Sequence, residues 1–375
     1  MTYCMAPFVH AYVMTGEETE RICCVAKPHC NTVETDLEKR WSSIEYQKIR
    51  QHMLSDTPTD YIKNICSNCI NVEAVGDESD RQRFNKTYND VEINIVTGNE
   101  FNTPLDLDLR PSNLCNLQCR MCVSTSSSQI EKEIQKHGEI LWFMGPEHVK
   151  INELDKKNIN FLLSNVEQSK RIKFLGGEPT IMREVHSVLD IMIDRNIVDI
   201  PIHFTTNLTN ANPTFLKKLE KFSNISFNYS IDGTGKTLEY IRHPVNWDLI
   251  QQNIKIYETI ASNSSISFTL QAYNLHNLKD FIDWSSSINV KMRINLVEQP
   301  EWDSIFVLPV DYRIRYLQDI NTNITNHLLH NNTKYSIIDF IRHTKILDKT
   351  RKQHIKDYIP EVWELIQEDY NALQI

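Results

Sequence analysis

Three cysteines close together in the sequence have a spacing that suits a metal cluster. They stand in Cys115-Asn-Leu-Gln-Cys119-Arg-Met-Cys122, a C-x3-C-x2-C pattern. Three thiolates in one loop can bind three irons of a cuboidal [4Fe-4S] cluster and leave the fourth iron open to a substrate. The alternatives are zinc and three buried, metal-free cysteines. Zinc prefers four nitrogen or sulfur ligands, and neither a fourth Cys nor a His follows at zinc-finger spacing.

The other six cysteines lie in the first 70 residues, at positions 4, 23, 24, 30, 66 and 69. The N-terminal residues show neither a basic region nor a long apolar run, and no stretch approaches about 18 apolar residues. We therefore expect a cytoplasmic protein with no signal peptide and no membrane partner. In a reducing compartment, cysteines more often bind metals or do redox chemistry than form disulfides.

Length and charge narrow the possibilities further. The 375 residues suffice for one domain of roughly 200 to 250 residues and a smaller one. The net charge of -9 and the lack of a long Lys/Arg run argue against broad nucleic-acid binding.

The elements around the three cysteines predict an α/β barrel. The stretch 103–110 alternates leucines with polar residues, as a strand does, so the cysteines lie in the loop after a strand. In α/β barrels, that end of the strands carries the active site. Strand-like runs then alternate with helical ones, a pattern that favours a parallel sheet. The predicted strands are 171–175, 202–208, 225–231, 266–271 and 290–297, and the predicted helices are 181–195, 213–222, 247–261 and 277–287.

Further motifs follow the cysteines in a familiar order. Gly176-Gly177-Glu178-Pro179 ends one predicted strand, Asn207 ends the next, and Ser230-Ile-Asp232-Gly233 ends the third, with Arg242 shortly after. Together with the cysteine loop, these motifs resemble the radical SAM superfamily over about residues 101–300. The resemblance implies a partial (β/α)6 TIM-type barrel and a [4Fe-4S] cluster whose open iron binds S-adenosylmethionine (SAM).

The same resemblance implies roles for single residues. Gly176, Gly177, Glu178 and Pro179 would lie at the amino group of SAM, and glycines suit a close backbone approach. Asn207, Ser230 and Asp232 would lie along the rest of the cofactor. Arg242 would pair with the SAM carboxylate, since a guanidinium fits a carboxylate as a fork; a solvated helix residue is the alternative.

The first 100 residues resemble the Cys-rich twitch and SPASM domains of radical SAM proteins. In such domains a Cys precedes a short hairpin and a second Cys ends it, as Cys4, Gly16 and Cys23 suggest here. A helix is predicted over 41–50, and Cys66-Ser-Asn-Cys69 precedes Glu73, Gly76, Ser79 and Arg81. The resemblance implies an auxiliary [4Fe-4S] cluster on Cys4, Cys23, Cys66 and Cys69. Cys24 and Cys30 are alternative ligands, and zinc is an alternative metal. His10 and His29 are expected to be surface or packing residues.

Residues 301–375 are predicted to be helical, over 311–321, 335–349 and 359–373, and to pack against the barrel without chemistry of their own. Trp302, Trp363 and Tyr370 are expected core anchors. The domain prediction is therefore an auxiliary domain over 1–100, the barrel over 101–300 and a helical region over 301–375.

The resemblance implies a radical SAM oxidoreductase or maturase. A reductant such as flavodoxin or ferredoxin would supply an electron, SAM would be cleaved to a 5'-deoxyadenosyl radical, and the radical would take hydrogen from a substrate. Twitch and SPASM relatives often modify peptides, so a peptide or protein is the first expectation and a small metabolite the second. The auxiliary cluster would accept the electron of the substrate radical. A non-catalytic iron-sulfur or zinc module for electron transfer or binding is the alternative.

Overall fold

The structure is a computed structural model. It describes residues 3–14, 19–55, 57–74, 76, 78–91, 103–151, 154–297, 299–318, 320 and 335–375. Two compact units account for these residues. The first comprises residues 1–113, 150–204 and 217–225, and the second comprises residues 114–149, 205–216 and 226–375. Gly16 and the end of the predicted helix 311–321 lie outside the described residues.

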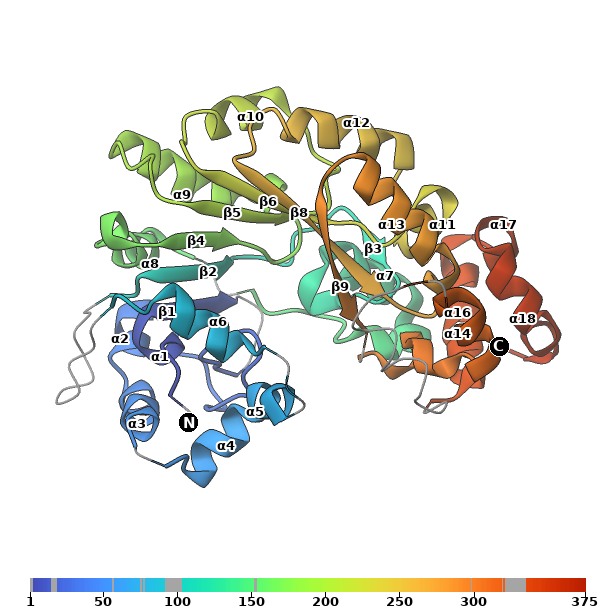
Figure 1. The fold of residues 1–375 in the computed structure, drawn as a ribbon, viewed down its shortest axis with the longest axis horizontal. Coiled ribbons are helices and arrows are strands. Elements are labelled where there is room, and N and C mark those ends of the chain that lie inside the picture. The colour runs from blue at the N-terminus through green and yellow to red at the C-terminus, as the bar shows by residue number, and fades with distance from the viewer. Residues whose placement is uncertain are drawn as a thin grey trace. The chain divides into compact units, whose positions relative to one another are not determined.

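A seven-stranded sheet carries the order β1-β2-β4-β5-β6-β8-β9 (Figure 1). Every pairing with a recorded register in this sheet is parallel. From β2 onward, neighbouring strands of the sheet follow one another in the order in which they occur along the chain. This order is expected when strand-helix units repeat and all crossovers have the same hand. Its strands are β1 (His10–Met14), β2 (Asp106–Arg110), β4 (Arg171–Phe174), β5 (Ile202–Thr206), β6 (Ile225–Ser230), β8 (Asn263–Leu270) and β9 (Lys291–Leu296).

The strands form where β-branched and aromatic residues alternate with polar ones. In β5 and β6, alternate residues are buried, and Phe174 of β4 stacks on Phe204 of β5 with ring centroids 5.1 Å apart. Leu107 and Leu109 of β2 are likewise buried. The predicted strands 103–110 to 290–297 are thus present, and the α/β class with a parallel sheet is confirmed. This sheet is consistent with the predicted partial barrel.

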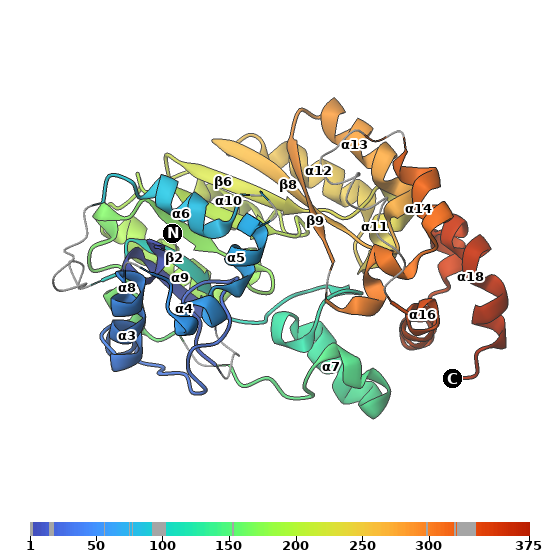
Figure 2. The same cartoon turned by 60° about the horizontal axis from the view of Figure 1, so that its bottom comes forward.

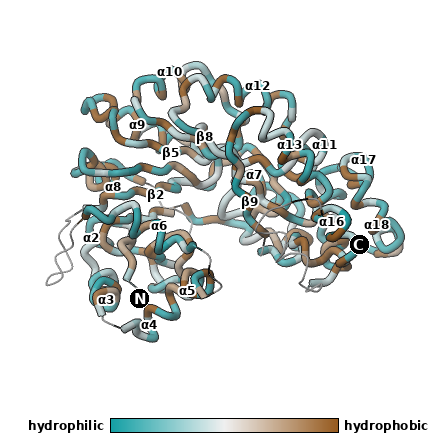
Figure 3. The backbone as a smooth tube through the Cα atoms, in the orientation of Figure 1, coloured by the Kyte–Doolittle hydropathy of each residue, from teal (hydrophilic) through white to brown (hydrophobic). Residues whose placement is uncertain are grey.

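Helices of the first unit cover its strands and form its N-terminal part. They are α1 (Ala6–Val9), α2 (Leu37–Trp41), α3 (Ile44–Met53), α4 (Asp60–Ile65), α5 (Ser67–Ala74), α6 (Asp80–Thr87), α8 (Lys156–Leu162) and α9 (Arg183–Asp194). Helix α9 contains both apolar and polar residues, and its buried residues recur at intervals of three and four, as expected of a helix with one buried face (Figure 3). An apolar core that includes Phe8, Trp41 and Ile49 holds the N-terminal part together.

The predicted capped helix 41–50 is present as α3, and only its bounds differ. It begins at Ile44 because Ser43 caps it by accepting a hydrogen bond from the Tyr46 backbone N–H. The predicted hairpin after Cys4 is replaced by helix α1 and strand β1, and β1 pairs in parallel with β2. Pro7 suits the first turn of α1, which explains why this apolar run begins as a helix.

The second unit contains β8, β9, most of β6 and the C-terminal helices (Figure 2). A two-stranded antiparallel sheet pairs β3 (Gln118–Cys119) with β7 (Arg242–His243). The helices of this unit are α7 (Ser128–His137), α11 (Gly235–Ile241), α12 (Trp247–Tyr257), α13 (Leu278–Ser287), α14 (Val310–Leu317), α16 (Ile337–Arg351), α17 (Ile355–Tyr358) and α18 (Pro360–Ala372); α10 (Pro213–Leu219) lies at the unit boundary.

The C-terminal helices pack on one another and on short 3-10 segments. Helix α16 contacts α18 and the segment η6 (Glu301–Asp303). Tyr370 is buried as predicted, whereas Trp302 and Trp363 are only partly buried. Within the residues that the structure describes, no helix combines the length and apolar character needed to span a membrane.

Candidate functional site

The loop that carries Cys115, Cys119 and Cys122 is held at several points of the second unit. Cys119 lies in β3 and pairs with Arg242 of β7. At the other end of the loop, the Ser128 hydroxyl donates to the carbonyl of Cys115 at 3.2 Å and accepts from its N–H at 3.3 Å. Ser127 caps α7 and donates to the Leu117 carbonyl at 2.7 Å. These contacts fix a loop that has little regular structure of its own.

The three thiols of this loop are shielded from water and influence one another. Cys115 and Cys119 are buried and Cys122 is half-buried. Burial raises the pKa of Cys122 to about 12, and the thiols of Cys119 and Cys115 contribute to the increase. Burial also raises the pKa of Cys119, although Arg242 opposes part of this increase. A bound metal would favour the thiolate forms, so this donor set suits a cationic cluster.

Arg242 connects the cysteine loop to the end of β6. Its Nε donates to Asp232 Oδ2 at 2.6 Å, and its Nη1 lies 3.9 Å from Cys119 Sγ. Asp232 is fully buried, and its Oδ1 also accepts the Thr269 N–H at 2.8 Å. Burial lowers the pKa of Arg242, but the Asp232 carboxylate and the thiols of Cys119 and Cys122 together raise it above its ordinary value, so the guanidinium stays charged. The structure therefore shows a buried ion pair at this position, and the solvated helix residue was the wrong alternative.

Asn207 meets the first cysteine of the loop in a similar way. Its Nδ2 lies 3.9 Å from Cys115 Sγ and 3.1 Å from Asn116 Oδ1. Its own Oδ1 accepts from the N–H and the hydroxyl of Thr209, which fixes the amide orientation. Ser230, at the end of β6, is half-buried. The second unit thus brings Asn207, Asp232 and Arg242 next to the cysteine loop.

The Gly176–Pro179 segment belongs to the first unit and follows β4. Gly176 has φ +108, and a Cβ at this position would lie 2.8 Å from the Ser112 carbonyl oxygen. The Gly177 N–H donates to that same oxygen at 3.2 Å. Ser112 precedes Cys115 by three residues, so the two glycines contact the chain directly before the cysteine loop. Only glycine fits Gly176 without strain.

Glu178 is fully buried and already has a local role. It caps the 3-10 segment η4 (Pro179–Ile181), and its Oε1 accepts from the N–H of Thr180 at 3.1 Å and from the Thr180 hydroxyl at 2.6 Å. Pro179 begins this short segment, and α9 starts only at Arg183. The capping fixes the carboxylate, a precondition for binding an ammonium group at a defined place.

In the N-terminal part of the first unit, each of the thiols of Cys4, Cys23, Cys66 and Cys69 interacts electrostatically with at least one of the others. Burial raises the pKa of Cys4 to about 12, and Cys66 and Cys69 add to the increase. Burial raises the pKa of Cys23 well above its usual value, and Cys24, Cys4 and Cys69 add to the increase in that order. The pKa of Cys66 is raised to about 12, by burial first and by Cys69 second.

The remaining two cysteines are arranged differently. Cys24 is exposed, and Cys30 Sγ lies 3.5 Å from the Thr32 hydroxyl. His10 is buried and its Nδ1 lies 2.7 Å from Asp106 Oδ1, which agrees with a packing role. Over the described part of the chain, no three His, Cys, Asp or Glu side chains are grouped as ligands of a single metal ion.

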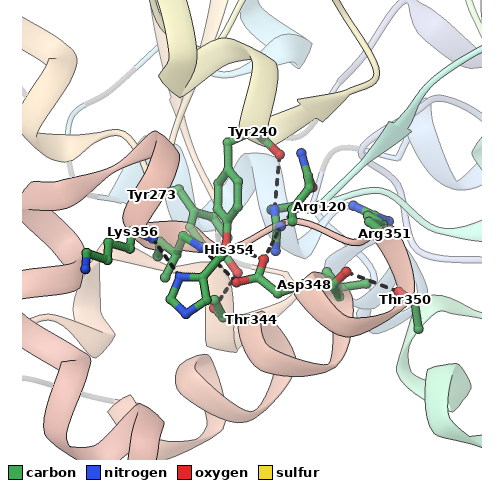
Figure 4. Close-up of polar contacts among 12 residues, drawn as sticks. Arg120, Tyr240, Tyr273, Thr344, Asp348, Thr350, Arg351, His354 and Lys356 are labelled. Carbon is green, nitrogen blue, oxygen red and sulfur yellow. Dashed lines mark hydrogen bonds and ion pairs between the residues drawn. The ribbon is translucent and has the colours of Figure 1, made fainter.

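A cluster of charged residues beside the cysteine loop was missed in the sequence. Arg120, between Cys119 and Cys122, is buried and donates to Asp348 Oδ1 at 2.6 Å (Figure 4). Asp348 lies 228 residues further along the chain, in α16. The only signal in the sequence was a charged residue inside the cysteine motif, and the sequence does not indicate which residue pairs with it.

One family model matches part of the chain. Residues 109–284 match the model of the Radical SAM superfamily, a range that includes the cysteine loop, Gly176–Pro179 and Arg242. This segment of the chain is similar to the radical SAM superfamily. The comparison with curated proteins gives no match.

Several solved structures are similar to this chain at low sequence identity. Streptococcus suis SuiB bound to precursor peptide SuiA is 14% identical, with TM-score 0.41, over 83% of this chain and 67% of that one. The anSMEcpe protein with bound AdoMet and Cp18Cys peptide is 12% identical, with TM-score 0.38, over 67% and 62% of the two chains. TYW1 with a lysine-pyruvate adduct is 16% identical, with TM-score 0.34, over 60% and 73%.

Proposed function

We propose that this protein is a radical SAM enzyme in which Cys115, Cys119 and Cys122 bind the catalytic [4Fe-4S] cluster. The observation that carries the proposal is the position of these three cysteines, in one buried loop inside the segment that matches the radical SAM family. Three thiol ligands suit a four-iron cluster with one open iron. When bound, the cluster would supply an electron that cleaves SAM to a 5'-deoxyadenosyl radical, which then takes hydrogen from a substrate.

The protein's own residues would place the cofactor and keep water out. Arg242 is charged and fixed by Asp232, so we propose it as a preorganised donor to the SAM carboxylate. Asn207 would orient the loop through Asn116 and Cys115. In the first unit, Gly176 and Gly177 would offer backbone carbonyls to the SAM ammonium, and the buried Glu178 and Pro179 are proposed to contribute to the same contact. In the second unit, Ser230 is proposed as a further contact of the cofactor.

The N-terminal cysteines support a second proposed centre. Cys4, Cys23, Cys66 and Cys69 would form a closed set of four thiol ligands, which suits a [4Fe-4S] cluster for electron transfer or a structural zinc. Such an arrangement is what the resemblance to twitch and SPASM domains implies. We propose the iron-sulfur cluster, with the domain boundaries 1–100, 101–300 and 301–375 as predicted, and a flavodoxin or ferredoxin as the reductant.

For the substrate, we propose a peptide or protein, with a small metabolite as the alternative. This choice rests on the resemblance to the twitch and SPASM branch, whose members often modify peptides. A maturase or oxidoreductase reaction would follow, in which the second cluster removes the electron left on the substrate.

The test is anaerobic incubation of the reduced protein with SAM, with 5'-deoxyadenosine measured by chromatography. We expect 5'-deoxyadenosine from the wild type and none from the Cys115→Ala/Cys119→Ala/Cys122→Ala variant. Iron and sulfide should be about eight per chain if both clusters are present and about four if only one is. Iron without 5'-deoxyadenosine would favour the electron-transfer module instead. A chain without iron-sulfur absorption would overturn the proposal.

A further inference from the structure

Helix α16 presents two buried charged residues to the cysteine loop and the helix after it. Asp348 and Arg351 are three residues apart and therefore lie on one face of the helix. Both are more than nine-tenths buried. The sequence assigned no chemistry to this C-terminal region, so the role of these charges has to come from their contacts.

Asp348 holds the middle of the cysteine loop through Arg120. The Arg120 Nη2 donates to Asp348 Oδ1 at 2.6 Å, and the Tyr240 hydroxyl donates to the same oxygen at 2.7 Å. The guanidinium lies on the ring of Tyr240, 3.5 Å from its centroid, and its Nε donates to the Tyr240 carbonyl (Figure 4). The other carboxylate oxygen accepts from the Ile355 N–H at 2.9 Å. One carboxylate thus joins the loop, α11 and the turn after α16.

Arg351 holds the helix that follows the loop. Its Nε and Nη2 donate to the two carboxylate oxygens of Glu133 in α7, at 3.0 and 2.9 Å. This two-bond fork is reinforced by the Thr350 hydroxyl, which donates to the same Glu133 at 3.1 Å. Since α7 begins six residues after Cys122, α16 contacts the chain both between the second and third cysteines and just beyond the third.

An apolar cluster surrounds these contacts. It comprises Ile130, Ile134, Leu141, Met144, Ile346 and Leu347, and the thiol-bearing Cys122 packs against it. Apolar packing already joins α16 to α7, and a buried ion pair is seldom more stabilising than a well-packed apolar pair. Two directional, charged contacts at this place therefore favour a role in setting the geometry of the loop.

We propose that Asp348 and Arg351 are positioning residues that hold the cysteine loop in the conformation that binds the cluster. Helix α16 is then part of the cluster-binding machinery through its contacts with Arg120 and Glu133. Arg120 is fixed on both sides, its N–H by the Ile241 carbonyl at 2.9 Å and its side chain by Asp348. The inference rests on the proposed function insofar as it takes Cys119 and Cys122 to be cluster ligands.

The first readout is hydrogen exchange of residues 116–123 in the metal-free, full-length chain. We expect Asp348→Asn to increase exchange in this segment about tenfold or more, because a charged hydrogen bond to the loop is lost. Lys345→Gln is the matched control. Lys345 lies one turn away on α16 and donates to the carbonyls of Tyr370 and Leu373, so its loss should leave exchange of the loop unchanged.

The second readout is iron release to a chelator, measured in a Cys66→Ala/Cys69→Ala background that removes the proposed auxiliary site. Asp348→Asn and Arg351→Lys should each release iron several-fold faster than Lys345→Gln. Arg351→Lys keeps the charge but loses the two-bond contact to Glu133. If Asp348→Asn does not fold, the iron release of Arg351→Lys tests the positioning role.

The two failures are distinguishable. Loop exchange and iron release that match those of the Lys345→Gln control would overturn the positioning role. Iron that persists in this background after Cys115, Cys119 and Cys122 are changed to alanine would overturn the proposed cluster site, while the exchange experiment on metal-free protein would still decide the role of α16.

Discussion

Arg242 Nη1 lies 3.9 Å from Cys119 Sγ, in a residue pair that also shares a rung of the short β3-β7 sheet. The guanidinium is held in place by Asp232 on its other side. A positive charge that donates toward a cluster ligand stabilises the more negative, reduced state of a cluster. The same residue is the proposed partner of the SAM carboxylate.

Replacement of Arg242 should affect both the cofactor and the cluster. We expect Arg242→Gln to weaken SAM binding about 10- to 100-fold, because charge-assisted hydrogen bonds are lost, and to lower the midpoint potential of the cluster. Arg242→Lys should give a smaller effect, since it keeps the charge without the fork. Anaerobic calorimetry with SAM and a redox titration measure the two quantities. An unchanged affinity in Arg242→Gln would contradict the role in SAM binding.

Gly176 should tolerate no side chain. Gly176→Ala adds a Cβ that meets the Ser112 carbonyl oxygen at 2.8 Å while φ is +108, so we expect a loss of about 3 kcal/mol or more in unfolding free energy. Gly138→Ala is the matched control. Its φ is +66 but its Cβ meets no atom within 4 Å, so only the backbone cost of about 1 kcal/mol should remain. Urea denaturation distinguishes them, and equal losses would show that the close contact is unimportant.

Asp303 should make stability depend on pH. It is almost fully buried, and burial raises its pKa to about 8, although Arg120 and Arg351 oppose the increase. An unfolded aspartate ionises near pH 4, so between about pH 4 and 8 the folded state binds more protons and stability falls as pH rises. Above about pH 8 the loss levels off.

Asp303→Asn removes this titration. Its unfolding free energy relative to wild type should therefore increase by about 1 to 3 kcal/mol between pH 5 and pH 8. Urea denaturation of the metal-free protein at several pH values measures the difference. Asp283→Asn, at an exposed carboxylate paired with Lys279, should show a constant difference. A constant difference for Asp303→Asn as well would mean that Asp303 is ionised in the folded state.

Arg81 should matter for metal binding by the N-terminal cysteines. Its Nη1 donates to the Tyr3 carbonyl at 2.9 Å, next to Cys4, and its Nε donates to Glu73 at 2.8 Å. Its charge also lowers the pKa of Cys4 and Cys66, against the larger effect of burial. In the Cys115→Ala/Cys119→Ala/Cys122→Ala background, Arg81→Met should reduce the metal bound per chain at least several-fold.

Arg83→Met provides the control for this experiment. Arg83 lies in the same helix, α6, but pairs with Asp80 at the surface, so metal content should stay at the level of the parent. A metal content unaffected by Arg81→Met would remove Arg81 from the site. Elemental analysis of the same samples also decides between iron and zinc.

The sequence by itself determined the local features of this protein. The C-x3-C-x2-C loop, Gly176-Gly177-Glu178-Pro179 and the alternating strands are contiguous, and each depends on residues within a few positions of one another. The parallel α/β class followed from the repeated strand and helix pattern. The hairpin predicted after Cys4 was wrong because a proline-started helix and pairing with the distant β2 outweighed local similarity.

Only the tertiary structure decided which distant residues meet. Arg120 and Asp348 are 228 positions apart, and no sequence pattern around either residue predicts that they form a pair. Asn207 and Cys115 meet because they follow strands whose ends the fold brings together. A charge in water needs no partner, whereas a buried one does, and burial is a property of the folded chain rather than of its sequence neighbours.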